Sequence, residues 1–200
     1  MLGPNVLVTP VLEPQADTVN GVFPGVADGT VWYDWYTGAR VDAQAGVNTS
    51  ISAPLGHIPV YLRGGSVTPL QEPGYTTAES RKNPWGLVVA LSGEGKASGS
   101  LYVDDGESIE QEATLNVCFE VEECELSAKV EGKYEDTNVL GSVKVLGVWG
   151  GVGEVKLNGE KVGEGCVEYD EKEGVLVVKG LNDVTKSGAW KGDWTLSWGK

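Results

Sequence analysis

Short apolar segments, separated by glycine, proline and polar residues, recur along the whole chain. Asn5–Leu12 is apolar, Thr30–Tyr36 alternates weakly and is rich in aromatic residues, and Ile58–Leu62 is apolar again. After a turn at Arg63-Gly64-Gly65, Val67–Leu70 continues this pattern. Such segments are typical of β-strands, and no stretch of ten residues shows helical periodicity. The pattern therefore predicts an all-β protein.

The second part of the chain is more regular. Its strand-like segments are Leu87–Leu91, Gly99–Val103, Leu115–Val121, Leu126–Val130, Ser142–Val148, Glu154–Leu157, Cys166–Tyr169, Val175–Lys179 and Trp194–Trp198. Within Val155–Val162, Asn158-Gly159 stands between alternating residues, which predicts a hairpin with a type I′ turn. Glu171–Gly174 marks a second hairpin turn. Short strands at spacings of roughly 8 to 12 residues favour β-sandwiches.

A polar, proline-containing stretch, Gln71–Trp85, separates the two parts. We therefore expect two tandem antiparallel β-sandwich domains, covering residues 1–80 and 81–200. The chain begins almost inside a strand pattern, which suggests a piece of a longer protein.

The charge balance excludes several partners. The 200 residues carry a formal net charge of −14 and are 40% hydrophobic. Nucleic-acid binding requires clustered Lys and Arg, and anionic membranes repel such a chain, so we expect neither partner. No apolar run approaches the roughly 20 residues that a membrane span requires. No signal peptide follows Met1, although a mature secreted chain would look the same.

Three cysteines are too few for a disulfide scaffold. If the segment from Cys118 to Cys124 turns back as a hairpin, their sulfurs could meet and form a disulfide in an oxidising compartment. Cys166 is then left as a thiol. With a single histidine, His57, and no His or Cys cluster at zinc-ligand spacing, we expect no metal and no cofactor.

Two aromatic segments are candidates for sugar stacking. Trp32–Tyr36 alternates, so its rings point to opposite faces, and we favour packing of one set in a core and the other against a neighbour. Trp194 and Trp198 lie on one strand face, which favours a core position. If the chain binds carbohydrate, Trp194 and Trp198 are the candidate pair.

The remaining motifs have structural interpretations. His57 lacks a triad context, and the glycines after Arg63 allow a tight turn. Asp104-Asp105-Gly106-Glu107 lacks the spacing of a calcium loop, and neighbouring carboxylates cannot face each other across a sugar, so we interpret it as a turn. Asn48-Thr49-Ser50 is a glycosylation sequon, expected on an exposed loop.

Several of these motifs together carry a family resemblance. In chain order they are Gly3–Leu12, Trp32–Gly38, Ala53-Pro54-Leu55, His57–Ser66 and Leu101–Ser108. The residues of these motifs and their order resemble the region that follows the catalytic barrel in glycoside hydrolase family 31, the α-glucosidases and α-xylosidases. The motif sequences are most similar to those of fungal secreted members. Beyond Glu110 the sequence no longer clearly resembles the family.

The resemblance implies a non-catalytic C-terminal portion of an α-glucosidase that hydrolyses maltose-like oligosaccharides and starch outside the cell. The family's two catalytic aspartates lie on a barrel that is absent here, so no catalytic residue is carried over and this chain alone is predicted to be inactive. Its expected partner is that barrel. Without the barrel, the apolar surface that would contact it is exposed, and we expect self-association through this surface. The alternative is a stand-alone carbohydrate-binding β-sandwich that uses exposed tryptophans to bind α-glucan oligosaccharides.

Overall fold

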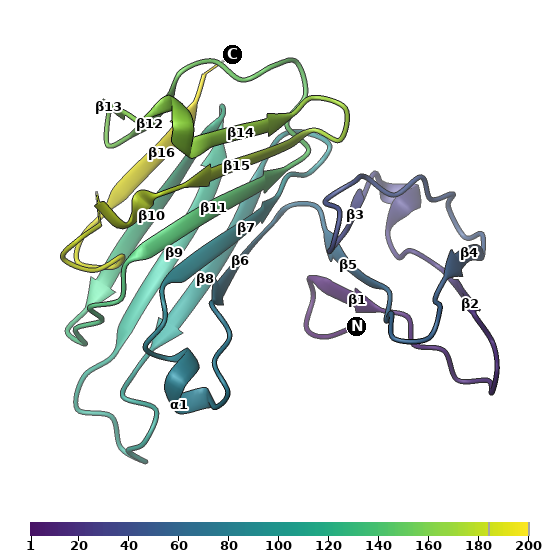
Figure 1. Ribbon diagram of the computed structural model, residues 1–200, viewed down its shortest axis with the longest axis horizontal. Coiled ribbons are helices and arrows are strands. Elements are labelled where there is room, and N and C mark those ends of the chain that lie inside the picture. The colour runs from purple at the N-terminus through teal and green to yellow at the C-terminus, as the bar shows by residue number, and fades with distance from the viewer. Residues whose placement is uncertain (184, 200) are drawn as a thin grey trace.

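The computed structural model describes residues 1–183 and 185–199, which form a small and a large body of β-structure (Figure 1). The small body contains β1 (Val6–Val8), β2 (Thr18–Gly21), the 3-10 turn η1 (Val26–Asp28), β3 (Trp32–Asp34), β4 (Thr49–Ser52) and β5 (Val60–Arg63). Its strands form a three-stranded sheet, β1-β5-β3, and a two-stranded sheet, β2-β4.

The large body follows from residue 66. Its elements are β6 (Ser66–Gln71), α1 (Thr77–Ser80), β7 (Trp85–Ala90), β8 (Ala97–Val103), β9 (Leu115–Glu122), β10 (Glu125–Gly132), β11 (Leu140–Leu146), β12 (Val155–Leu157), β13 (Glu160–Lys161), η2 (Glu164–Cys166), β14 (Val167–Asp170), β15 (Val175–Lys179), η3 (Leu181–Asp183) and β16 (Trp194–Trp198). The strands form one sheet in the order β13-β12-β16-β10-β9-β8-β6-β7-β11-β15-β14.

This long sheet doubles back on itself and becomes a sandwich. A single bridge, Ser66 to Ser98, joins β6 to β8 at the fold line. Gly99 follows at once, and a Cβ there would lie 2.3 Å from the Val67 carbonyl oxygen, so the close approach of the two strands requires glycine. One apolar core lies between the two halves and draws residues from both.

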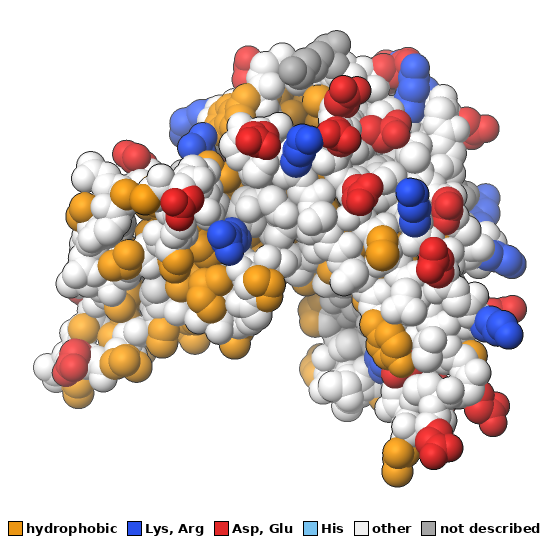
Figure 2. All heavy atoms as spheres, turned by 180° about the vertical axis from the view of Figure 1, so that it is seen from behind, with side chains coloured by type: hydrophobic (Ala, Val, Ile, Leu, Met, Phe, Trp, Pro, Cys, Tyr) orange, Lys and Arg blue, Asp and Glu red, His pale blue; other side chains and the backbone are white. Residues whose placement is uncertain are grey.

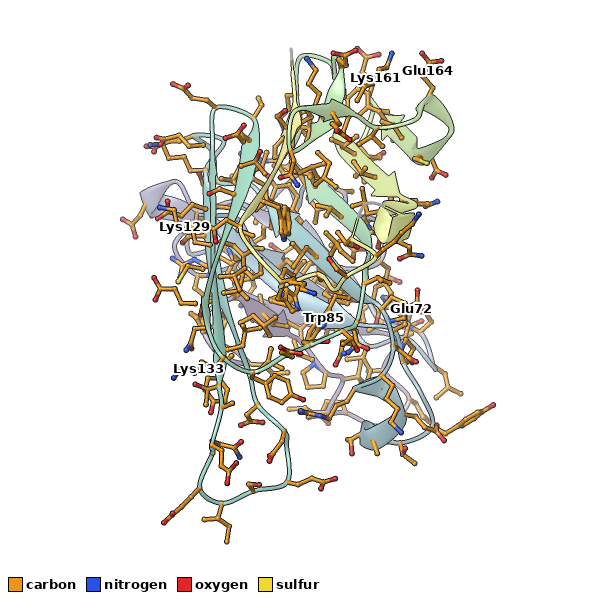
Figure 3. All side chains as sticks on the ribbon, turned by 90° about the vertical axis from the view of Figure 1, so that its left-hand side faces the viewer. Glu72, Trp85, Lys129, Lys133, Lys161 and Glu164 are labelled. Atoms are coloured by element: carbon orange, nitrogen blue, oxygen red, sulfur yellow. The ribbon has the colours of Figure 1, made fainter. Side chains whose placement is uncertain are left out.

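Strict alternation explains how the strands fill this core. Along β9 every second residue is buried, from Leu115 to Val121, and the residues between them are exposed. Figure 3 shows Trp85 between the two halves of the sandwich, whereas Lys129 and Lys133 point outward from the β10 side. The predicted all-β class is confirmed.

Both predicted hairpins are present. Asn158 and Gly159 have φ values of 51° and 80° between β12 and β13, as the expected turn requires. The 171–174 turn joins β14 to β15, where the Asp170 carboxylate accepts hydrogen bonds from the amides of Lys172 and Glu173.

Two features differ from the expected pattern. β11 pairs with β7 in parallel, so the sheet is mixed and the expected purely antiparallel arrangement is wrong at this point. β6, expected to continue the first sandwich, pairs instead with β7 in the large sheet. The domain boundary near residue 80 stays a prediction, because strand pairing shows which sheet a segment joins and not which segments fold independently.

The small three-stranded sheet is buried on both faces. On one face Leu7, Trp32 and Tyr61 pack with Ile51 of β4. On the other face Tyr33 and its neighbours pack against β7, β11 and β15 of the large sheet. The junction between the bodies is therefore a second apolar core. No helix among the described residues is long and apolar enough to cross a membrane.

Candidate functional site

The tryptophan pair proposed for sugar binding lies in the core of the large body. Trp194 and Trp198 are 6% and 1% exposed. The Trp194 indole Nε1 donates to the Ala189 carbonyl oxygen at 3.0 Å, and its ring stacks on Trp190 at a centroid distance of 6.2 Å. Buried rings offer no face to a saccharide, so the sugar-binding role given to this pair is corrected to a core role.

The Trp32–Tyr36 segment packs in the way its alternation predicted. Trp32 lies inside the small body, where its ring neighbours Phe23 at a centroid distance of 6.0 Å. Tyr33 lies on the opposite face, in the junction with the large body. Trp35 packs there too, while Tyr36 is exposed and lies beside His57 at a centroid distance of 4.8 Å.

Tyr33 is the central polar contact of the junction. Its hydroxyl donates to the Leu91 carbonyl oxygen at 2.8 Å, and burial raises the pKa of this phenol to about 12. Gly147 leaves room for it, because a Cβ at that position would lie 2.1 Å from the hydroxyl oxygen. Burial also lowers the pKa of Lys144 on β11, and the nearby Asp34 carboxylate opposes that shift. The hydrogen bond from Tyr33 to Leu91 therefore links the small body to the large one.

The expected disulfide is not formed. All three cysteines are free thiols, and Cys118 lies opposite Lys129 in the β9–β10 hairpin. Cys124 stands in the turn of that hairpin, between the paired residues Glu122 and Glu125. The segment does turn back as a hairpin, the condition set for the disulfide, but the tight turn separates the two cysteines along the strand, so the possible disulfide does not form.

The acidic segment after β8 is a turn. Asp105 accepts hydrogen bonds from the amides of Glu107 and Ser108 and from the Ser108 hydroxyl. These bonds hold the pKa of its carboxyl well below the usual range. Asp104 accepts from the Gly106 amide at 2.8 Å. The carboxylates are thus engaged in local backbone contacts.

The other single-residue candidates lie apart from one another in the chain. Arg63 ends β5, and its guanidinium donates weakly to the Thr30 hydroxyl at 3.4 Å. A Cβ at Gly64 would lie 2.3 Å from Val31, so a close approach requires this glycine. Asn48 is exposed just before β4, and its glycosylation stays a prediction. Across residues 1–183 and 185–199, no group of three His, Cys, Asp or Glu side chains could hold a metal ion.

Exposed apolar side chains gather on the small body instead. They are Met1, Leu2, Leu12, Val22, Tyr36, Val47, Leu55 and Ile58. Figure 2 shows apolar side chains over this body with few charges among them. Residues 1–68 carry five acidic and two basic residues, whereas residues 69–200 carry twenty-four and thirteen. We call this set the small-body apolar surface, and its composition is typical of an interaction surface.

A further feature, which no pattern in the sequence indicates, is an open groove beside the junction. Trp149, in the loop after β11, is 49% exposed and lines two hollows of about 350 and 310 Å³. Arg40 and Val31 line both hollows as well. Gly147, Gly150 and Gly151 mark the loop in the sequence, but no pattern there distinguishes an exposed tryptophan from a packed one.

These features define a class of protein: an all-β, sandwich-type region with filled cores and an apolar surface on one of its two bodies. A family model described as the glycosyl hydrolase family 31 C-terminal domain matches residues 1–68, which cover the small body. An α-glucosidase of Aspergillus niger is 54% identical over 198 residues, and glucoamylase 1 of Schwanniomyces occidentalis is 47% identical over 197 residues. These alignments cover 99% and 98% of this chain and 20% of each relative.

Solved structures agree with this assignment. The α subunit of glucosidase II matches with a TM-score of 0.76 and 26% identity, covering 97% of this chain and 22% of that one. The chain therefore belongs to glycoside hydrolase family 31, as the C-terminal region of such an enzyme, which confirms the resemblance of its motifs. It spans about a fifth of the length of the curated relatives it matches.

Proposed function

We propose that this chain is the non-catalytic C-terminal portion of an α-glucosidase, and that its small body docks on and supports the catalytic barrel. The parent enzyme would hydrolyse α-glucosidic bonds in maltose-like oligosaccharides and starch outside the cell. Relatives named α-glucosidase and glucoamylase support this activity, because they match nearly the whole chain.

The observation that carries the proposal is the small-body apolar surface. Its residues lie within the segment that the family model matches. Leu55 is 107% and Ile58 is 55% exposed, which leaves their apolar area in water unless a partner covers it. A missing domain of the same polypeptide is the partner that best accounts for an uncovered surface in a chain spanning a fifth of its relatives.

A chimera tests the proposal. The 198 matching residues of the Aspergillus niger α-glucosidase are replaced by this chain, and secretion and maltose hydrolysis are measured. We expect the chimera to be active and the enzyme truncated before this region to be inactive or aggregated. A truncated enzyme with full activity would refute the supporting role.

Two matched substitutions then locate the contact. Leu55→Asp changes a fully exposed residue of the small-body apolar surface, and Ile109→Asp changes an equally exposed residue of the large body, 102% exposed. We expect Leu55→Asp to reduce the yield or activity of the chimera and Ile109→Asp to leave both unchanged. Equal effects of the two changes would contradict docking through the small body. Self-association of the isolated chain through the same surface would be lost in Leu55→Asp.

A further inference from the structure

The groove beside the junction is built from segments that are distant in the sequence. Its first hollow, about 350 Å³, lies among residues 26–32 and 40–43 of the small body, with Trp149 on the large-body side. Its second hollow, about 310 Å³, continues along the β7–β8 loop, the β9–β10 turn and the loop after β11. Because Val31, Arg40 and Trp149 line both hollows, the two form one groove, which we call the Trp149 groove. Each hollow matches the lower range of volumes for small-molecule sites.

Trp149 is held in place at the wall of this groove. A Cβ at Gly174 would lie 3.0 Å from two carbons of the indole six-membered ring, so the ring packs closely on this glycine. The preceding loop residues Gly147 and Val148 both donate to the Gly174 carbonyl oxygen at 2.9 Å, and the Tyr169 hydroxyl donates to the Val148 carbonyl oxygen at 3.0 Å. A large aromatic ring is thus positioned by rigid contacts while half of its surface stays in water.

Charged side chains of the Trp149 groove are available for a ligand. Within the described residues, the side chains of Arg40 and Asp42 form no hydrogen bond or ion pair, and both are exposed. Glu94 of the β7–β8 loop lines the second hollow, together with Ser92, whose hydroxyl oxygen accepts from the amides of Glu94 and Lys96. The groove therefore presents a cationic donor and carboxylate acceptors around one exposed indole.

This combination fits a neutral saccharide. The apolar C–H face of a pyranose packs on an aromatic ring, while its hydroxyls both donate and accept hydrogen bonds. The carboxylates of Asp42, Glu94 and Glu123 disfavour an anionic ligand. The hydroxyls of a neutral saccharide can donate to these carboxylates and accept from Arg40, so such a ligand matches groups of both signs. We propose that the Trp149 groove is a saccharide-binding site that takes short neutral gluco-oligosaccharides, with Trp149 as the stacking residue. The choice of α-linked glucans rests on the proposed function.

Binding to the 200-residue chain tests this site directly. Maltotriose and maltopentaose are titrated by calorimetry, and amide shifts are mapped by two-dimensional NMR. We expect saturable binding with shifts concentrated in residues 91–95 and 147–151. Absence of saturation in the millimolar range, or shifts confined to other segments, would overturn the proposal. Cellotriose serves as the β-linked probe, and binding equal to that of maltotriose would overturn the choice of α-glucans.

Matched variants identify the residue responsible. Trp149→Ala is expected to weaken maltotriose binding by about tenfold or more, and Arg40→Gln to weaken it several-fold. Tyr75→Ala, at an aromatic residue that is 102% exposed outside the groove, is expected to bind as the unmodified chain does. Wild-type affinity in Trp149→Ala would refute the stacking role. This experiment measures binding alone, so a chimera that fails in catalysis would refute the proposed function and leave this result standing.

Discussion

The contact between Tyr33 and Gly147 supports a sharp test of how the two bodies are joined. In Gly147→Ala the new Cβ would lie 2.1 Å from the Tyr33 hydroxyl oxygen, so the ring must move. Gly150→Ala is the matched control, because Gly150 lies in the same loop and nothing lies within 4 Å of its added Cβ. The two glycines have similar φ values, 86° and 93°.

The two substitutions share one cost and differ in another. An alanine with positive φ costs about 1–2 kcal/mol at either position. Only Gly147→Ala also displaces Tyr33, which loses a buried hydrogen bond of about 1 kcal/mol and forces repacking that costs about 1–3 kcal/mol. We therefore expect Gly147→Ala to lower the free energy of unfolding by about 3 kcal/mol more than Gly150→Ala.

Urea unfolding followed by tryptophan fluorescence measures this difference, and Tyr33→Phe completes a double-mutant cycle. Without the hydroxyl, the nearest Tyr33 atom to the added Cβ is Cζ at 3.0 Å, so Gly147→Ala should cost at least about 1 kcal/mol less in the Tyr33→Phe background. Equal destabilisation by the two glycine changes, or additivity of Tyr33→Phe and Gly147→Ala within about 0.5 kcal/mol, would refute the reasoning.

Three further predictions concern a buried tryptophan, a buried tyrosine and the free cysteines. Trp194→Ala should destabilise the chain by about 3–5 kcal/mol because it empties a core position, and unfolding midpoints close to wild type would contradict this. The Tyr33 phenol ionises near pH 10 when unfolded and near 12 when folded, so the folded state is the more protonated one between these values. Stability should therefore fall as pH rises through this window, by up to about 3 kcal/mol, and Tyr33→Phe should reduce the fall. In denatured protein, Cys118 and Cys124 should react with a thiol reagent as free cysteines, and a reductant should leave the unfolding midpoint unchanged; a shift would indicate a disulfide.

The strands of the large body were predictable because their local patterns are self-sufficient. Alternation along Leu115–Val121 and the Asn158-Gly159 turn each specify a structure within a few residues. The parallel pairing of β11 with β7 was not predictable, since the two strands are more than forty residues apart and no local pattern encodes their direction. The placement of Val67–Leu70 in the large sheet depends on the same kind of long-range pairing.

The candidate site was less accessible from sequence than the fold. Alternation correctly placed Trp32 and Tyr33 on opposite faces, because that inference needs only strand geometry. The exposure of Trp149 depends on Gly174 and on loops from both bodies, which meet only in the folded chain. Local composition and residue spacing do not indicate which distant loops come into contact, so only the three-dimensional structure reveals the groove.

The burial of β1-β5-β3 on both faces bears on what the small body can do. One face packs on Ile51 and Phe23, and the other on the large sheet, so neither face is left for a partner. The apolar residues that remain exposed, such as Leu12, Leu55 and Ile58, lie in its connecting segments. They contribute little to either core, and their exposure costs solubility in the isolated chain. The proposed contact with a further domain therefore depends on these connecting segments and not on a face of the small sheet.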